Sequence, residues 1–469
     1  MNETNVARPF GLRDKVGYFA GDFGNNFLFM MAGSYLMVFY MRVLGINGAI
    51  IGTLFLVARF IDAFTDMGMG RIVDRVSPTK GGKFRPWIRR VAGPVALASF
   101  LMYQSGLADA SMPIKIIYMF VTYILFGSVC YTAINIPFGS MASAISNNPK
   151  DRASLSTFRT LGGTFGSIIV SVVAPQLIFY ADSNGNQLVS PSGFMLAAGI
   201  FSAFALISYI ICYLLTTERV KFDEEKVKKE KQTGLIETFR HIGTNKAFIA
   251  LLTASIVLLL STMMSQSINA FLFADYFSNT NALSFRGLIG IPVTMLIATM
   301  TSKISGKFGK KEASVVGMLF TGVAYVIIFF LKIKNAWIFL GVTLIAGIGM
   351  SYFNMLTWAM VTDVIDYQEV KTGNRADGMI YGAYSFARKL GQALAGGLGG
   401  FALAAVGYEQ TLATQTESVK LGIYGLSTLV MGMFFIVVAF ILLFAFPLNK
   451  ITVDKNVVEL EKRRETNTN

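Results

Sequence analysis

The sequence predicts an all-α integral membrane protein in which twelve transmembrane helices form two six-helix halves. Composition supports this class, because 54% of the 469 residues are hydrophobic and only 14% are charged. A soluble domain is about a quarter charged, since it needs a polar shell. The third observation is the distribution of the apolar residues, which gather in twelve long stretches separated mainly by short polar loops.

Each apolar stretch is long enough to cross a bilayer, since a helix needs about 20 apolar residues to span a hydrocarbon core of roughly 30 Å. The two halves are expected at 1–216 and 247–448, with a linker at 217–246 and a tail at 449–469. The linker mixes acidic and basic residues, which is typical of a solvated connection. The twelve expected spans are 16–41, 48–70, 87–107, 114–144, 153–180, 194–216, 247–273, 284–303, 312–331, 335–362, 376–406 and 421–448.

Lysine and arginine residues predict the orientation, because positively charged loops stay on the cytoplasmic side. With both termini in the cytoplasm, 31 of the 41 basic residues lie on that side and four lie inside spans. We therefore expect a multi-pass protein of the cell membrane with both termini cytoplasmic. The net charge of +14 follows from this asymmetry, so the expected partner is the lipid bilayer and not nucleic acid. The six basic residues on the opposite side are Arg42, Lys115, Arg286, Lys332, Lys334 and Lys420.

The motifs argue against an enzyme. The sequence has no HExxH metal site, no P-loop and no paired nucleophile and base. Its two cysteines lie in apolar stretches and its one histidine in a basic polar segment, so no metal cluster and no cofactor are expected. No selectivity-filter loop indicates a channel. The alternative to a transporter is a membrane sensor that signals through the linker.

Ionisable residues in the second span are functional candidates, because charges are costly in hydrocarbon. Asp62 and Asp66 are four residues apart and share a helix face, with Arg59 one turn before Asp62. Two close carboxylates repel each other, so a proton or a bound cation between them is favoured. A hydroxyl at Thr65 or on a facing helix can add an oxygen ligand. The alternative is a buried network in which Arg59 only neutralises the acids.

Other spans carry polar residues that suit a sugar. Asn135 can donate to and accept from a hydroxyl, although a hydrogen bond between helices explains it equally well. Trp358 lies one turn from Asn354, and the pair can stack on a sugar ring or simply pack in the bundle. The basic residues in the remaining spans can bind a carboxylate or sulfonate, or can balance a fixed aspartate: Arg159, Arg388 and Lys389.

At these residues the chain resembles the glycoside–pentoside–hexuronide:cation symporters, a branch of the major facilitators. The resemblance covers nearly the whole chain. It implies the major facilitator fold, whose halves are parallel repeats. It also implies a functional monomer that carries a glycoside with H+ or Na+ by alternating access, with a facilitated uniporter as the alternative. The most specific segments are Gly21–Asn26, Asp62–Asp66, Gly82–Trp87, Tyr131–Ser140, Asp363–Gly378 and Phe386–Ala393.

The residues themselves and the resemblance together give two sets of candidate site residues. The cation-binding candidates are Asp62, Thr65, Asp66 and Thr132, with a sodium site possible at the two aspartates. The substrate-binding candidates are Asp22, Asn25, Asn26, Tyr131, Asn135, Arg159, Asn354, Trp358, Tyr384, Ser385 and Lys389.

The chain is more similar to the glucuronide carriers of this branch than to its melibiose permeases. Melibiose permeases have aspartates where this chain has Asn26 and Asn135, a stacking tryptophan at Gly139 and an asparagine at Thr65. The pocket is therefore less negative, while Arg159 and Lys389 remain. This change favours an anionic glycoside such as a glucuronide, although the branch's xyloside carriers are similar too. The threonine leaves the choice between sodium and proton open.

Overall fold

Ten helices in the described part of the chain are long and apolar enough to cross a membrane, and each coincides with an expected span. The computed structural model describes residues 8–79, 81–220, 245–373, 380, 383–384, 387–388, 391–392, 395 and 397–466. The ten spans are Leu12–Val43, Gly48–Val73, Met112–Ile145, Pro149–Ile178, Pro191–Leu215, Lys246–Tyr276, Thr280–Thr301, Lys310–Leu331, Ala336–Thr372 and Glu417–Ala445.

The two remaining expected spans also contain helix. The third span, 87–107, holds α3 (Arg85–Leu101), which has 17 residues and is followed by a short 3-10 turn, η2 (Ser105–Leu107). The eleventh, 376–406, lies partly outside the described residues. Its described end is α16 (Leu398–Ala405).

Several spans are composite, because a wider π-helical turn interrupts or ends the α-helix. In the N-terminal part the elements are α1 (Leu12–Val38), η1 (Phe39–Val43), α2 (Gly48–Arg75), α4 (Met112–Ile124), η3 (Leu125–Tyr131), α5 (Thr132–Ile145), α6 (Pro149–Ile178) and α7 (Pro191–Leu215). In the C-terminal part they are α10 (Lys246–Phe271), η4 (Leu272–Tyr276), α11 (Thr280–Phe308), α12 (Lys310–Leu331), α13 (Ala336–Ala346), α14 (Ile348–Thr372), α17 (Glu417–Gly425), η5 (Leu426–Val430), α18 (Met431–Phe440), η6 (Ile441–Ala445) and α19 (Lys450–Thr466).

Local sequence explains where many of these helices begin. Polar caps accept hydrogen bonds from the free N–H groups of the first turn, as Asn47 does for α2 and Asn335 for α13. Proline occupies the first turn of α6 and of α7, where its missing N–H costs nothing.

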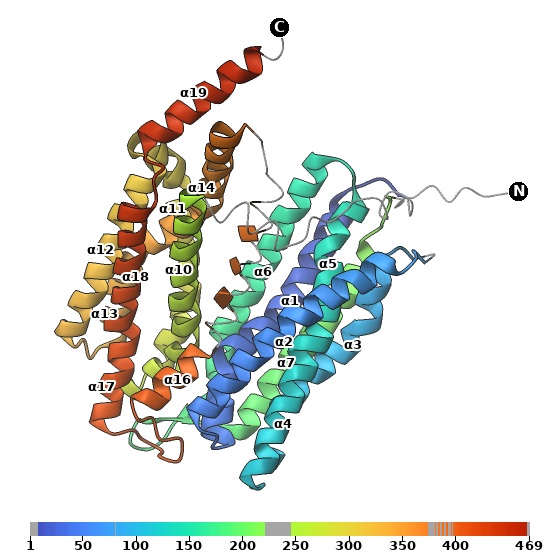
Figure 1. Ribbon diagram of the computed structural model, residues 1–469. Coiled ribbons are helices and arrows are strands. Elements are labelled where there is room, and N and C mark those ends of the chain that lie inside the picture. The colour runs from blue at the N-terminus through green and yellow to red at the C-terminus, as the bar shows by residue number, and fades with distance from the viewer. Residues whose placement is uncertain are drawn as a thin grey trace, which may run out of the picture. The chain divides into compact units, whose positions relative to one another are not determined.

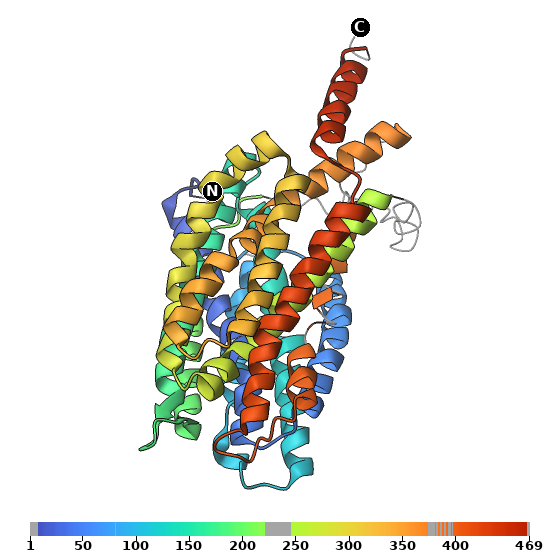
Figure 2. The same ribbon diagram turned by 90° about the vertical axis from the view of Figure 1, so that its left-hand side faces the viewer.

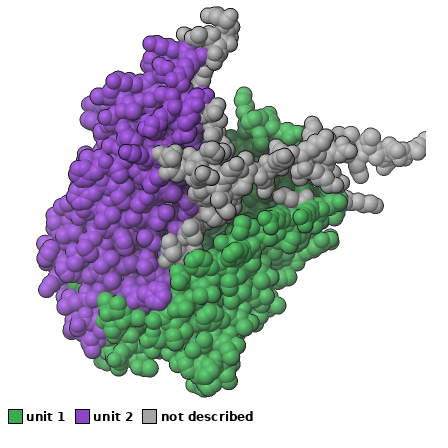
Figure 3. All heavy atoms as spheres, viewed as in Figure 1, with its two compact units in different colours: residues 1–229, 269–288, 403–415 green, residues 230–268, 289–402, 416–469 purple. Residues whose placement is uncertain are grey.

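The described chain divides into two compact units (Figure 3). Unit 1 comprises residues 1–229, 269–288 and 403–415, and unit 2 comprises 230–268, 289–402 and 416–469. In unit 1, α1 packs along α6 and α7. Glycine permits the close approach of α1 and α6, since a Cβ on Gly162 would lie 2.2 Å from the carbonyl oxygen of Phe19. In unit 2, α12 packs against α14 and α18.

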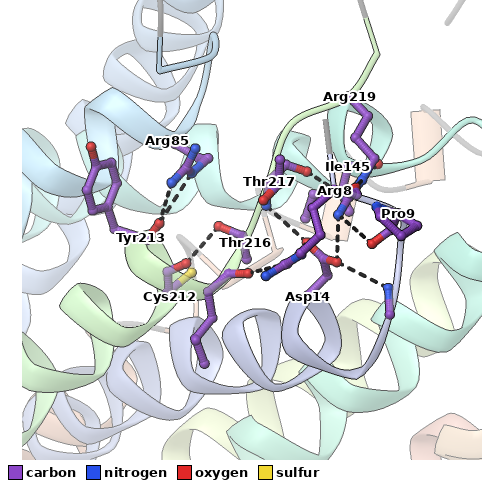
Figure 4. A network of polar contacts seen from close by, with 12 residues as sticks. Arg8, Pro9, Asp14, Arg85, Ile145, Cys212, Tyr213, Thr216, Thr217 and Arg219 are labelled. Atoms are coloured by element: carbon purple, nitrogen blue, oxygen red, sulfur yellow. Dashed lines mark hydrogen bonds and ion pairs between the residues drawn. The ribbon is translucent and has the colours of Figure 1, made fainter. Parts of the chain in front are cut away.

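A buried carboxylate joins the start of α1 to the segment that follows α7 (Figure 4). Asp14 is fully buried and pairs with Arg8 at 3.1 Å and with Arg219 at 2.8 Å. The backbone N–H of Thr217 donates to the same carboxylate at 3.0 Å. Because a buried charge needs partners, these contacts fix the entry of the first span against the end of the sixth.

Two regions beyond the expected spans are helical. The charged run that begins at Asp363 reads as a connection between spans, but α14 stays helical to Thr372. Lys310 binds Asp363 at 2.6 Å. The tail forms α19, which lies beyond the end of α18 (Figures 1 and 2) and contacts α14, where Arg463 donates to the carbonyl of Val370 at 3.2 Å.

Unit 1 also contains a small antiparallel hairpin that was not expected, formed by β1 (Phe179–Ala181) and β2 (Gln187–Val189). Next to it lies a buried ion pair between Arg42 and Asp275, whose side chains are 7% and 3% exposed. Arg42 also donates to the hydroxyl of Tyr408 at 2.7 Å and to the carbonyl of Gln187 at 3.2 Å.

Tyr408 completes this contact, since its hydroxyl donates to Asp275 at 3.3 Å. Burial raises the pKa of Tyr408, so the phenol keeps the proton that it donates. The cluster of Arg42, Asp275 and Tyr408 therefore ties η1, η4 and the segment after α16 together.

Candidate cation and substrate sites

The two aspartates of α2 face two hydroxyls on the fourth span. Oδ1 of Asp62 accepts a hydrogen bond from Ser128 at 2.5 Å, and Oδ1 of Asp66 accepts one from Thr132 at 2.9 Å. The two aspartates are four residues apart on α2, and the two hydroxyl residues are four apart on the fourth span. The two contacts therefore lie one helical turn apart, like the rungs of a ladder. We call these four residues the hydroxyl–carboxylate ladder.

A π-helical turn lies directly beside the ladder. Ser128 belongs to η3, and Thr132 is the first residue of α5. Such wider turns are frequent at functional sites, because they change which side chains share a helix face. Here both hydroxyls face α2, and Thr132 also donates to the carbonyl of Gly127 at 3.3 Å.

Arg59 and Thr65 lie beside the ladder but form neither of its two hydroxyl–carboxylate hydrogen bonds. The guanidinium of Arg59 lies 3.6 Å from Oδ2 of Asp62, on the oxygen that Ser128 does not use. The hydroxyl of Thr65 donates to the backbone carbonyl of Asp62 at 3.2 Å, as helical threonines often do. Its oxygen retains lone pairs, but the structure does not place it in a rung.

The chemistry of the ladder suits a proton or a small monovalent cation. Its four side chains offer only oxygen ligands, which hard cations prefer. A proton bound by either carboxylate would relieve the repulsion between the two acids. Within the residues that the structure describes, no group of three or more His, Cys, Asp or Glu side chains could hold a metal ion.

Asp22, Asn26 and Arg159 form a second polar group in unit 1. Nε of Arg159 donates to Asp22 at 3.0 Å, and the amide of Asn26 donates to the other oxygen of Asp22 at 3.3 Å. Ser167 donates to the amide oxygen of Asn26 at 3.1 Å. The guanidinium also lies over the ring of Phe138 at 5.2 Å. The bond to Asp22 uses Nε, and the guanidinium also makes a side-chain hydrogen bond with Tyr18, so some of its five N–H donors remain for another acceptor.

The remaining candidates in unit 1 differ in accessibility. Asn25 is buried, and its amide oxygen accepts from the hydroxyl of Tyr209 at 2.7 Å. Tyr131 is half-buried and stacks on Phe29 at 6.3 Å. Asn135 is half-buried and makes no side-chain hydrogen bond within the described part of unit 1. Asn135 is thus better placed than Asn25 to meet a ligand.

Unit 2 holds a separate aromatic group. Trp358 is 39% exposed and meets Tyr384 edge-on, with ring centroids 5.2 Å apart. Tyr384 is fully buried, and its hydroxyl donates to Ser255 at 2.6 Å. The guanidinium of Arg388 lies over both rings, 5.6 Å from Trp358 and 5.9 Å from Tyr384.

The other candidates of the C-terminal half are more isolated or not described. Asn354 is exposed one turn before Trp358. Ser385 and Lys389 lie outside the described residues.

Three serines contact candidate residues that sequence reasoning selected, but were not themselves selected: Ser128, Ser167 and Ser255. Of the three, only Ser128 could have been selected from the sequence. It lies four residues before Thr132, which repeats the spacing of the two aspartates. Serine is too common in membrane helices for the other two to stand out.

The chain is similar to known sugar transporters along most of its length. The family model described as MFS/sugar transport protein matches residues 17–450. The chain is 33% identical to the uncharacterized symporter YjmB of Bacillus subtilis, with 95% of this chain and 94% of that protein covered. It is 30% identical to the glucuronide carrier protein homolog of Escherichia coli, with 96% of both chains covered. The isoprimeverose transporter of Lactiplantibacillus pentosus is also 30% identical, with 87% and 83% covered.

A solved structure shows the same fold at low identity. A bacterial homologue of the human lysosomal transporter Spinster, in an inward-facing and unoccupied conformation, matches with a TM-score of 0.67 and 14% identity over 95% of this chain and 97% of that one. The expected major facilitator fold of twelve helices is therefore confirmed, and the protein is a multi-pass membrane transporter and not an enzyme. The chain belongs to the MFS/sugar transport protein family, in its glycoside–pentoside–hexuronide:cation symporter branch.

Proposed function

We propose that the protein carries a glycoside across the cell membrane by symport with a monovalent cation, H+ or Na+, bound at the hydroxyl–carboxylate ladder. The observation that carries this proposal is the pair of rungs, in which Asp62 faces Ser128 and Asp66 faces Thr132. Two carboxylates and two hydroxyls thus meet between α2 and the fourth span. In hydrocarbon such a group needs a compensating positive charge.

The alternative role of the aspartates, a purely structural ion-pair network, explains less of the geometry. Arg59 lies beside Oδ2 of Asp62, whereas Oδ1 of the same residue faces Ser128. Neutralisation by arginine does not require a hydroxyl opposite each acid. A site that binds and releases a cation does use such hydroxyls, because they add oxygen ligands beside the carboxylates.

The substrate that we propose is a glycoside, with an anionic one such as a glucuronide preferred over a neutral xyloside. Two relatives are named for a glucuronide and for isoprimeverose, which supports a glycoside as the substrate. Asn26 and Asn135 can exchange hydrogen bonds with sugar hydroxyls. Arg159, held by Asp22 through Nε, can donate further hydrogen bonds to the glycoside.

The orientation and assembly belong to the same proposal. The excess of Lys and Arg in one set of loops supports cytoplasmic termini. We expect a functional monomer that works by alternating access between its two six-helix halves, 1–216 and 247–448, as in related transporters.

Uptake into vesicles tests the proposal. Purified protein in proteoliposomes should accumulate radiolabelled p-nitrophenyl glucuronide above the external concentration when an inward proton or sodium gradient is imposed. The ionophore that collapses the effective gradient should abolish accumulation. Equilibration without accumulation would instead show a uniporter, and no flux of any glycoside would favour the sensor alternative.

A further inference from the structure

We propose that Arg388, stacked on Trp358, binds the anionic group of the substrate. The inference rests on the proposed transport of a glycoside, and it assigns the selectivity for charge to one residue of unit 2. The sequence leaves open whether Arg388 binds an anion or balances a fixed aspartate, and the contacts of Arg388 favour the first role.

The first argument is charge balance inside the membrane. Two other arginines that sequence reasoning placed in spans have acidic partners, since Arg59 lies beside Asp62 and Arg159 binds Asp22. Arg388 contacts two aromatic rings and has no carboxylate partner among the residues described. A ring quadrupole contributes only about 0.5–2 kcal/mol toward holding a cation. A guanidinium in a span therefore still requires an anion, and a ligand can provide it.

The second argument is the exposed face of α14. Between residues 354 and 362 its exposed positions recur every four residues and are polar or aromatic: Asn354, Trp358 and Thr362. The exposed positions earlier in the same span are apolar, with Ile345 61% and Ile348 42% exposed. An apolar face suits lipid, whereas a polar stripe at membrane depth suits water or a ligand. Trp358 therefore presents its exposed surface on the face that suits a ligand.

The third argument is the fit of a sugar acid. The apolar C–H face of a pyranose can lie on the indole of Trp358, while Asn354 one turn away can bind a hydroxyl. A carboxylate or sulfonate attached to the sugar ring can then reach Arg388, whose planar fork binds such groups bidentately. Lysine, as a point charge, would offer less directional binding.

Tyr384 positions this pair. Its ring is fully buried, meets Trp358 edge-on, and is fixed by the 2.6 Å hydrogen bond to Ser255. The indole and the guanidinium thus rest on a rigid support. Tyr384 acts through its neighbours, and we do not expect it to touch the substrate.

Matched ligands give a direct test. Equilibrium binding to purified protein would be measured by titration calorimetry with p-nitrophenyl glucoside, p-nitrophenyl glucuronide and the corresponding 6-sulfonate, which differ only at the sixth carbon. Wild type should bind both acids ten- to a hundred-fold more tightly than the glucoside, since a charge-assisted contact contributes about 1.5–3 kcal/mol. Arg388→Gln should remove most of this preference and change glucoside affinity less than about threefold.

Two further variants separate recognition from structure. Arg388→Lys should keep part of the preference, so it serves as the test if Arg388→Gln does not fold. Arg89→Gln removes an arginine that also lies over an aromatic ring, that of Tyr213 at 5.7 Å, but in an exposed position, and it should keep the full preference.

The outcomes distinguish this inference from the proposed function. Equal affinity of wild type for acid and glucoside, or equal losses for both ligands in Arg388→Gln and Arg388→Lys, would overturn the role of Arg388 while glycoside uptake in vesicles could still occur. Absence of uptake and of binding for all three ligands would instead refute the proposed function itself.

Discussion

The hydroxyl of Thr132 donates to Oδ1 of Asp66 across 2.9 Å, one helical turn from the matching contact of Ser128 with Asp62. Each contact joins a carboxylate of α2 to a hydroxyl on the fourth span. The relationship matters because a carboxylate alone can be a structural counter-charge, whereas two carboxylates with two aligned hydroxyls form a set of cation ligands.

We predict that the hydroxyls of the ladder set the affinity for the coupling ion. Ser128→Ala and Thr132→Ala should each raise the ion concentration for half-maximal glycoside uptake about tenfold, because a hydrogen bond to a charged group contributes roughly 1.5–3 kcal/mol. Thr53→Ala is the matched control, since that hydroxyl, also on α2, donates to the carbonyl of Ala49. An unchanged ion dependence in both ladder variants would show that the hydroxyls are not ligands.

The ladder also shows how far sequence reasoning reaches. The spacing of Asp62 and Asp66 predicts a shared helix face, which requires only helical geometry. Thr132 followed from resemblance, whereas Ser128 was missed, although its four-residue spacing from Thr132 repeats that of the two aspartates. Thr65 has the right chemistry, yet its hydroxyl bonds to the backbone of its own helix. Only the structure shows which acceptor a serine or threonine hydroxyl binds.

The helical spans were predictable for a simpler reason, since a bilayer demands about 20 apolar residues per helix. Features that depend on pairing between distant segments were not. The contact of Arg42 with Asp275 joins residues 233 positions apart. The continuation of α14 to Thr372 was not predicted either, because the charged residues after Thr362 are typical of a loop between spans. The helix of the tail, α19, was not predicted because it contains no long apolar stretch.

Gly163 should be essential for the polar group around Asp22. A Cβ at this position would lie 2.5 Å from Oδ2 of Asp22 and 2.7 Å from the amide nitrogen of Asn26. Gly163→Ala must therefore displace these side chains, and we expect glycoside affinity to fall ten- to a hundred-fold, the value of one charge-assisted contact. The control is Gly93→Ala in α3, where a Cβ meets nothing within 4 Å. Equal glycoside affinity in both variants would argue against a role for Asp22 and Asn26 in binding.

The buried ion pair of Arg42 and Asp275 should stabilise the protein against unfolding. Asp275→Asn leaves Arg42 buried without its counter-charge, which typically costs about 3–5 kcal/mol. The melting temperature of purified protein should fall clearly, and exchanging the two residues should restore part of it. Glu417→Gln breaks an exposed pair with Lys420 and should have little effect. A melting temperature for Asp275→Asn as high as that of Glu417→Gln would contradict the stabilising role.

Single cysteines can test the proposed orientation. Native Cys130 and Cys212 are buried, so the background reaction should be low. A cysteine replacing Asn184, in the exposed turn of the hairpin, should react with an impermeant maleimide on intact cells. One replacing exposed Lys455 on α19 should react only after permeabilisation. Labelling of the Lys455 position in intact cells would place the C-terminus outside the cell and contradict the proposed orientation.

The most direct test of cation coupling compares two modes of transport in the same vesicles. Asp62→Asn and Asp66→Asn each remove a charge from the ladder but leave a side chain of similar size. Both variants should still exchange labelled for unlabelled glycoside at equilibrium, because exchange needs no net movement of the cation. Neither should accumulate glycoside under a proton or sodium gradient that drives uphill uptake by wild type. Uphill accumulation by both variants at the wild-type level would contradict the ladder as the coupling site.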